Sequence, residues 1–85
     1  MREAILRPPA RAYYSLMSDA ERDAIDRRIR RLEHDPSPDG RTTFAVSDID
    51  GLFLYDDGIW QMAYAVSDNA TLVIRSIAHA LDLPP

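Results

Sequence analysis

Three β-like runs in the C-terminal half, joined by short turns, constrain the fold of this chain more than any other feature. They cover residues 52–55, 59–66 and 72–79. The first turn, Asp56-Asp57-Gly58, is a strong hairpin signal because Asp and Gly tolerate the backbone angles of tight turns, and the second, Ser67-Asp68-Asn69-Ala70, has similar chemistry. Parallel neighbours would need crossovers of a dozen or more residues. The three runs are therefore predicted to form an antiparallel meander.

The N-terminal half predicts a short strand followed by two helices. Residues 3–6 have strand character, and Pro8-Pro9 ends the strand because proline lacks the backbone N–H. Residues 10–17 carry apolar side chains at helical spacing. Ser18-Asp19-Ala20-Glu21 is a capping box, so a second helix should begin there and continue to about residue 34. The expected fold is α+β, with an N-terminal strand and an αα-hairpin packed on the antiparallel β-meander.

Apolar side chains in the second helix and in the middle β-like run predict the core. In the helix they recur every three or four residues, and in the run they alternate with small or polar side chains. The aromatic members could instead stack on nucleic-acid bases, but burial under the helices is the simpler interpretation. The residues expected in the core are Ile25, Ile29, Leu32, Trp60, Met62 and Tyr64.

The residues of the middle run that alternate with the expected core residues are predicted to line an open face of the sheet. Gln61, Ala63 and Ala65 share this phase, and the two alanines leave the face shallow. Phe53 and Tyr55 are out of phase with the leucines of their own run, so they are expected at the margin of the same face. A shallow apolar face of this kind suits an extended segment or a helix of a partner protein. Phe53, Tyr55, Ala63 and Ala65 are therefore the candidate partner-binding residues.

The composition excludes several kinds of site. A chain of 85 residues allows one domain, residues 1–85, with one modest core. Without cysteine there is no disulfide or thiolate metal site, and His34 and His79 are too few for a histidine cluster. We expect no metal and no cofactor. No apolar run approaches the roughly 20 residues of a membrane span, so we expect a soluble, cytoplasmic protein.

Charge is distributed unevenly along the chain. Residues 1–41 hold nine Arg and eight acidic residues, whereas residues 42–85 hold only Arg75 against six Asp. A surface that follows a nucleic-acid backbone normally carries a cluster of cations, because neutralised phosphates release their counterions. The β-like half lacks such a cluster, which favours protein contact over RNA contact.

The arginines of the second helix form a separate group. Acidic residues precede them at helical spacing, as in Asp23 with Arg27 and Asp26 with Arg30. Such spacing predicts ion pairs along a solvated helix face. The alternative is a nucleic-acid or partner-binding face, since the end near Arg31 is locally positive.

The order of strand, two helices and antiparallel strands resembles the RelE/ParE superfamily of bacterial toxins along nearly the whole chain. Three motifs carry the resemblance: the Asp35-Pro36 exit from the second helix, the hairpin run Gly58-Ile59-Trp60-Gln61-Met62-Ala63-Tyr64, and the closing Ile77-Ala78-His79. The resemblance implies a toxin of a type II toxin–antitoxin module, which inhibits growth and is neutralised by a small antitoxin.

Ribonucleases of this superfamily cleave mRNA on the ribosome with basic or tyrosine side chains of the hairpin and the closing strand. Here the hairpin Arg position is Gln61, and the two basic positions after the closing motif are Ala80 and Leu81. His79 remains as a general acid or base, and Arg75 is expected on the same face as a phosphate-binding cation. The resemblance thus gives His79, Arg75 and Gln61 as candidate catalytic positions of a weak, metal-independent endoribonuclease.

Two other interpretations stay open. A binding module of the same fold would act by protein contact, on gyrase as ParE-type members do or on another protein. The chain could also be an unrelated small α+β protein, because a fold does not determine a function. In either case His79 would be a structural histidine at a strand end, and Arg75 would pair with an acid such as Asp68 or Asp82.

Overall fold

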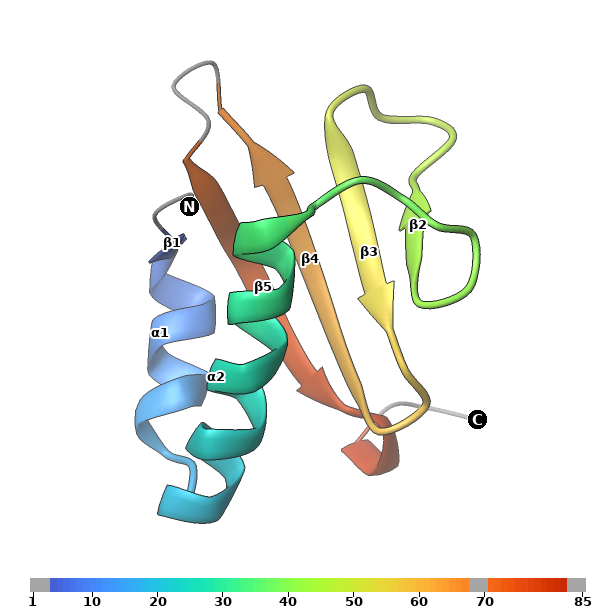
Figure 1. The fold of residues 1–85 in the computed structure, drawn as a ribbon. Coiled ribbons are helices and arrows are strands. Elements are labelled where there is room, and N and C mark those ends of the chain that lie inside the picture. The colour runs from blue at the N-terminus through green and yellow to red at the C-terminus, as the bar shows by residue number, and fades with distance from the viewer. Residues whose placement is uncertain (1–3, 68–70, 83–85) are drawn as a thin grey trace.

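The computed structural model describes residues 4–67 and 71–82 and has two helices on one face of a five-stranded sheet (Figure 1). This is the expected α+β fold. None of the described helices is long and apolar enough to cross a membrane. The elements in chain order are β1 (Ala4–Leu6), α1 (Pro8–Ser15), α2 (Asp19–His34), β2 (Thr43–Ala45), β3 (Leu52–Asp56), β4 (Trp60–Val66) and β5 (Leu72–His79), followed by a 3₁₀ turn, Ala80–Asp82.

The strand order in the sheet is β1-β5-β4-β3-β2. Strands β2 to β5 pair antiparallel with their neighbours in sequence, so the predicted meander is confirmed, and residues 43–45 join it as an additional edge strand. β1 pairs parallel with β5, with Ala4 opposite Leu72, which the sequence did not predict. Part of the predicted turn at residues 67–70 lies outside the described residues.

Local signals in the sequence fix where both helices begin. α1 starts at Pro8, since a proline in the first turn of a helix loses no hydrogen bond. α2 begins after Ser18, as predicted. The Ser18 Oγ accepts a hydrogen bond from the Glu21 amide at 3.2 Å, and the Glu21 carboxylate accepts one from the Ser18 amide at 2.9 Å.

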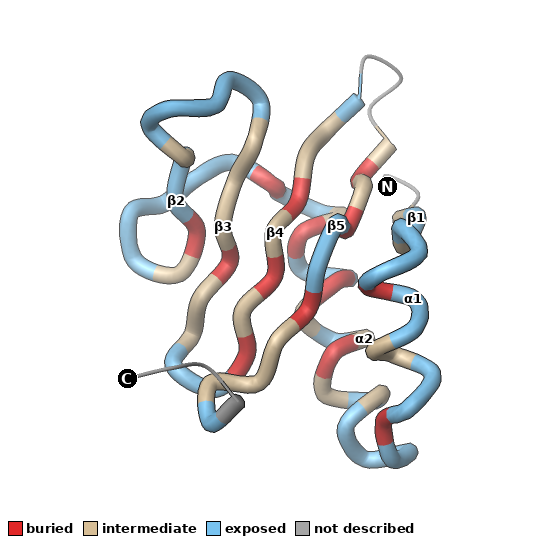
Figure 2. The backbone as a smooth tube through the Cα atoms, turned by 180° about the vertical axis from the view of Figure 1, so that it is seen from behind, coloured by how far each residue is buried: buried red, intermediate tan, exposed pale blue. Residues whose placement is uncertain are grey.

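The core lies between the helices and the sheet. Figure 2 shows buried and half-buried segments alternating along β4, as expected of a strand with one face against the core. The hydroxyl of Tyr64 donates to the Pro36 carbonyl at 2.7 Å, which holds the α2–β2 loop over the same face. All six residues expected in the core are buried: Ile25, Ile29, Leu32, Trp60, Met62 and Tyr64.

A β-bulge interrupts the pairing of β4 with β5. Ala63 lies opposite Ser76, but the next residue of β4, Tyr64, lies opposite Ile74, so Arg75 is an extra residue in β5. An extra residue shifts the alternation of the side chains by one position. Ile74 therefore points toward the helices on one side of the bulge, and Ile77 points toward them on the other.

Candidate functional site

The face of the sheet turned away from the helices, called here the open face, is lined mainly by apolar side chains. Residues directly opposite each other in neighbouring strands point to the same face, so the register identifies the members. Ile5 and Phe44 are 46% and 36% exposed. No described helix lies over this face. One cross-strand row contains Ile5, Val73, Ala65 and Leu52, and the next contains Ser76, Ala63, Leu54 and Phe44.

Two of the candidate partner-binding residues do not lie on the open face. Phe53 is paired with Tyr64 and Tyr55 with Met62, so both point toward the helices. The rings of Phe53 and Tyr64 are stacked with centroids 5.5 Å apart, and Tyr55 is only 2% exposed. The expected placement of Phe53 and Tyr55 is therefore wrong. Leu52 and Leu54 occupy the open face instead. The prediction failed because every residue of this run is apolar or aromatic, so the sequence pattern does not distinguish the two faces.

The other two partner-binding candidates, Ala63 and Ala65, lie on the open face, and Gln61 marks the polar end of the face on the same strand. At this end the Gln61 side-chain amide donates to the Asp56 carboxylate at 3.0 Å, across the β3–β4 pair. Arg75 is exposed at the bulge. Among residues 4–67 and 71–82, the polar end of the open face is thus neutral or acidic, and the cation beside the face is Arg75 on β5.

His79 lies on the opposite side of the sheet. It is paired with Trp60, and the two rings meet edge to face with centroids 4.7 Å apart. The backbone N–H of His79 donates to the Tyr13 hydroxyl at 3.3 Å, and its Nδ1 accepts from the Leu81 amide at 3.1 Å. Because Nδ1 accepts a hydrogen bond, the neutral ring carries its hydrogen on Nε2. His79 therefore contacts the core, α1 and the 3₁₀ turn.

The three candidate catalytic residues are not brought together. Gln61 and Arg75 belong to the open face, whereas His79 points toward the helices. The expectation that Arg75 and His79 share a face is wrong, because it assumed strict alternation along β5. The bulge at Arg75 reverses the phase of every residue that follows it.

An ion pair that the sequence did not predict joins α2 to the β3–β4 turn. Arg28 Nε lies 2.6 Å from Asp57 Oδ2, which also accepts from the Tyr55 hydroxyl at 2.7 Å. Asp57 Oδ1 accepts from the amides of Ile59 and Trp60. Burial alone would raise the pKa of Asp57, but these hydrogen bonds hold the pKa well below its usual range. Burial, and then the Asp57 carboxylate, raise the pKa of Tyr55 to about 12.

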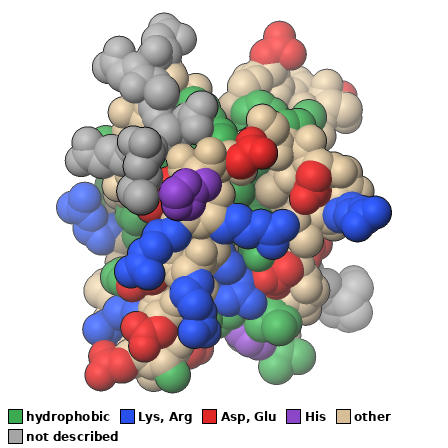
Figure 3. Space-filling view, in the orientation of Figure 1, with side chains coloured by type: hydrophobic (Ala, Val, Ile, Leu, Met, Phe, Trp, Pro, Cys, Tyr) green, Lys and Arg blue, Asp and Glu red, His purple; other side chains and the backbone are tan. Residues whose placement is uncertain are grey.

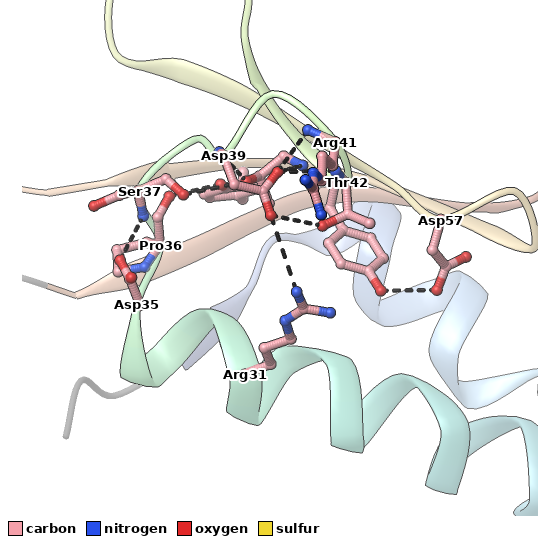
Figure 4. A network of polar contacts seen from close by, with 11 residues as sticks. Arg31, Asp35, Pro36, Ser37, Asp39, Arg41, Thr42 and Asp57 are labelled. Carbon is pink, nitrogen blue, oxygen red and sulfur yellow. Dashed lines mark hydrogen bonds and ion pairs between the residues drawn. The ribbon is translucent and has the colours of Figure 1, made fainter.

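A second carboxylate network lies in the turn that leads into β2 (Figure 4). The Asp39 carboxylate accepts from the amides of Arg41, Thr42 and Thr43, and these hydrogen bonds hold its pKa well below the usual range. Arg31 Nη2 lies 4.0 Å from the same carboxylate. These hydrogen bonds fix the turn between α2 and β2, and the amide of Thr43 is the one that belongs to β2.

No group of three or more potential metal ligands occurs among residues 4–67 and 71–82.

No protein-family model and no curated protein sequence matches the chain. Solved structures do match, among them the following two. The isolated E. coli RelE toxin superposes with a TM-score of 0.75 at 10% identity, covering 94% of this chain and 85% of that chain. The chain has the RelE fold. A chain of the intact E. coli RelBE toxin–antitoxin complex matches with a TM-score of 0.74 at 10% identity, covering 94% of this chain and 98% of that chain.

The expected RelE-like architecture is therefore confirmed. Within this RelE fold, the exposed cations gather on the helical side of the molecule, and Figure 3 shows many of them on the face that α1 and α2 cover. The open face has Arg75 as its cation and is otherwise apolar or neutral around Ala63 and Ala65.

Proposed function

We propose that this chain is the toxin-like component of a toxin–antitoxin module, and that a small antitoxin neutralises it by docking on the open face. The RelE fold combined with an uncovered apolar sheet face is the observation that carries the proposal. A protein of the same fold has been solved with its antitoxin in the RelBE complex. Large apolar faces on small proteins usually mark contact with another molecule.

The chemistry of the open face describes the segment that would bind there. Ala63 and Ala65 allow another backbone to approach the middle of the sheet, and Leu52, Leu54 and Phe44 offer apolar contact beside them. Carboxylates lie at both ends of β3, as Asp56 at its end and as exposed Asp48 and Asp50 in the loop before it. An apolar segment flanked by basic residues is the complementary partner.

Action by protein contact fits the site better than RNA cleavage does. Attack of a 2′-hydroxyl on the adjacent phosphate needs an acid or base and a cation at one phosphate. His79 and Arg75 lie on opposite faces of the sheet and do not meet this requirement. The target would be a protein such as gyrase. A weak ribosome-dependent endoribonuclease is the alternative, and it would require His79 or Arg75 to act alone.

Induced expression tests the proposal. Expression of the chain alone should arrest growth, and co-expression of the neighbouring open reading frame should restore it. His79→Ala should arrest growth as well as the natural chain, because protein contact does not need the imidazole. Normal growth under strong induction, with soluble protein present, would contradict the toxin assignment. Loss of arrest in a folded His79→Ala variant would instead favour the ribonuclease.

A further inference from the structure

The 3₁₀ turn at Ala80–Asp82, called here the closing turn, follows β5 directly. Figure 1 shows it at the same end of the molecule as the turn between β3 and β4. The Ala80 amide donates to the Ile59 carbonyl at 2.8 Å, which attaches the start of the closing turn to the hairpin. One residue further on, the Leu81 amide donates to Nδ1 of His79 at 3.1 Å. The hairpin therefore supports the start of the turn, and the imidazole supports its middle.

The imidazole is held in place by groups outside the closing turn. Its ring meets the Trp60 ring edge to face, with the centroids 4.7 Å apart and the planes at 87°. Trp60 belongs to the core, with only 4% of its surface exposed. The backbone N–H of His79 donates to the Tyr13 hydroxyl on α1, which fixes the end of β5 against the helical layer. The core thus sets the position of the imidazole, and the closing turn is built on it.

Only the neutral form of His79 can accept the hydrogen bond from the closing turn. One nitrogen of a neutral imidazole carries a hydrogen and the other accepts, and here Nδ1 is the acceptor. Protonation places a hydrogen on Nδ1, so the Leu81 amide would then face a second donor. Rotating the ring by half a turn does not restore the contact, because it brings a C–H group to the amide. Protonation therefore removes the support for the middle of the turn.

We propose that His79 is a pH-dependent switch, which holds the closing turn in place when neutral and releases it when protonated. This regulation goes beyond the proposed toxin–antitoxin function. Histidine changes its charge between about pH 5 and pH 8, so the switch operates in the physiological range. The closing turn carries the Leu81 side chain, which is 87% exposed, and starts beside Ile59, which is 52% exposed. Release of the turn therefore changes the apolar surface that this end of the molecule presents.

The groups that meet the imidazole from the sheet and from α1 are Trp60 and the Tyr13 hydroxyl, and neither carries a charge near neutral pH. An indole ring also attracts a cation placed against its face. Contact with Trp60 is therefore compatible with both forms of the imidazole, and the Leu81 amide is the group that protonation displaces.

Three carboxylates belong to the elements around this end of the molecule. Glu21 of α2 lines a surface hollow together with the end of α1, and it accepts from the Ser18 amide. Asp57 in the β3–β4 turn is bound by Arg28. Asp82 belongs to the closing turn itself. A carboxylate near the imidazole would move the transition to higher pH, but it would not give Nδ1 back its ability to accept.

The expected change is local. Loss of one hydrogen bond should lower the ratio of closed to open turn by roughly twofold to tenfold. The Ala80–Ile59 hydrogen bond and the pairing of β4 with β5 do not involve the imidazole, so they remain. The switch therefore alters the closing turn without unfolding the domain.

Nuclear magnetic resonance of the ¹⁵N-labelled full chain, titrated from about pH 8 to about pH 5, tests the proposal. At the upper pH the His79 ring should carry its hydrogen on Nε2. As the pH falls, the Leu81 amide signal should shift and its heteronuclear NOE should decrease. Trp60 is the only tryptophan of the chain, and a protonated imidazole quenches the fluorescence of an indole that it contacts. Trp60 fluorescence should therefore decrease with the same midpoint.

Two substitutions of His79 separate the acceptor from the charge. In His79→Asn the amide oxygen stands in the place of Nδ1 and does not titrate, so the heteronuclear NOE of Leu81 should stay high over the whole pH range. In His79→Ala the acceptor is absent, so the NOE should be low throughout, in a chain whose folding is checked by circular dichroism. If the alanine variant does not fold, the asparagine variant still decides.

Controls at two other titratable side chains exclude other origins of the transition. His34→Gln removes the other histidine, at an exposed position on α2, and should leave the change at Leu81 as it is. Asp82→Asn should at most move its midpoint. A hydrogen on Nδ1 at the upper pH would overturn the proposal, as would quenching of Trp60 without any change at Leu81, or an equal change at Leu81 in His79→Asn. None of these measurements depends on toxicity or on an antitoxin.

Discussion

Arg28 on α2 and Asp57 in the β3–β4 turn form an ion pair, 2.6 Å from Nε to Oδ2, in which only 19% and 16% of the two side chains are exposed. The pair connects the helical layer to the hairpin of the sheet. Asp57 has a double role, since its other carboxylate oxygen caps the amides that follow the turn. A residue that forms the turn thus also holds the two layers together.

Arg28→Ala should destabilise the fold because it leaves the Asp57 carboxylate without its cation. Breaking a fully buried pair costs about 3–5 kcal/mol, and the partial exposure here reduces our expectation to about 2–3 kcal/mol. Urea denaturation measures the difference. Arg27→Ala, at an exposed position one residue earlier, should change the free energy of unfolding by less than about 0.5 kcal/mol. Equal effects of the two substitutions would contradict the role of the pair.

The stability of the protein should fall in acid, partly through Asp57. Its pKa is lowered in the folded state, whereas an unfolded Asp titrates near pKa of about 3.9. The unfolded chain therefore binds more protons in this range, so the contribution is complete above about pH 5 and is lost as the pH falls. Denaturation at a series of pH values should give a shallower slope for Asp57→Asn than for the natural chain. An identical slope would mean that Asp57 is not the carboxylate responsible.

Ribonuclease activity should be weak or absent, because Gln61, Ala80 and Leu81 stand where the resemblance leads us to expect basic residues. Cleavage of mRNA on purified ribosomes, followed by primer extension, measures the activity. Any residual cleavage should decrease in His79→Ala, whose folding is checked by circular dichroism. Rapid cleavage that persists in this variant would show that the chemistry lies elsewhere on the molecule.

The sequence predicted those parts of the fold that depend on local signals. The capping box at Ser18 placed the start of α2, and the turn Asp56-Asp57-Gly58 placed the β3–β4 hairpin. Helical spacing identified the buried side of α2, including Ile25 and Ile29. Each signal involves residues close in the chain, so each could be recognised without the structure.

The errors concern which face of the sheet a residue occupies. In β3 both phases are apolar, so the pattern could not place Phe53 and Tyr55. In β5 the sequence did contain a sign of the bulge. Strict alternation would place Ile77 on the opposite face from Leu72 and Ile74, and an extra residue between them lets all three apolar side chains face the core. Because we assumed strict alternation through Arg75, we wrongly expected Arg75 and His79 on the same face.

Long-range contacts account for the remaining differences. The Arg28–Asp57 pair joins residues 29 positions apart, and neighbouring acids gave Arg28 a simpler local explanation. Charge spacing along a helix predicts ion pairs only where no better partner lies elsewhere in the fold.

The central claim is that a partner protein binds the open face, and co-purification of the neighbouring gene product with variants of this chain tests it most directly. Ala63→Arg places bulk and charge in the middle of the face and should abolish co-purification while the fold is retained. Ala20→Arg makes the same substitution at an exposed position of α2 and should leave co-purification intact. If Ala63→Arg has no effect, and reversal of Arg27 and Arg31 to Glu abolishes binding, then the partner binds the helical side and the account is wrong.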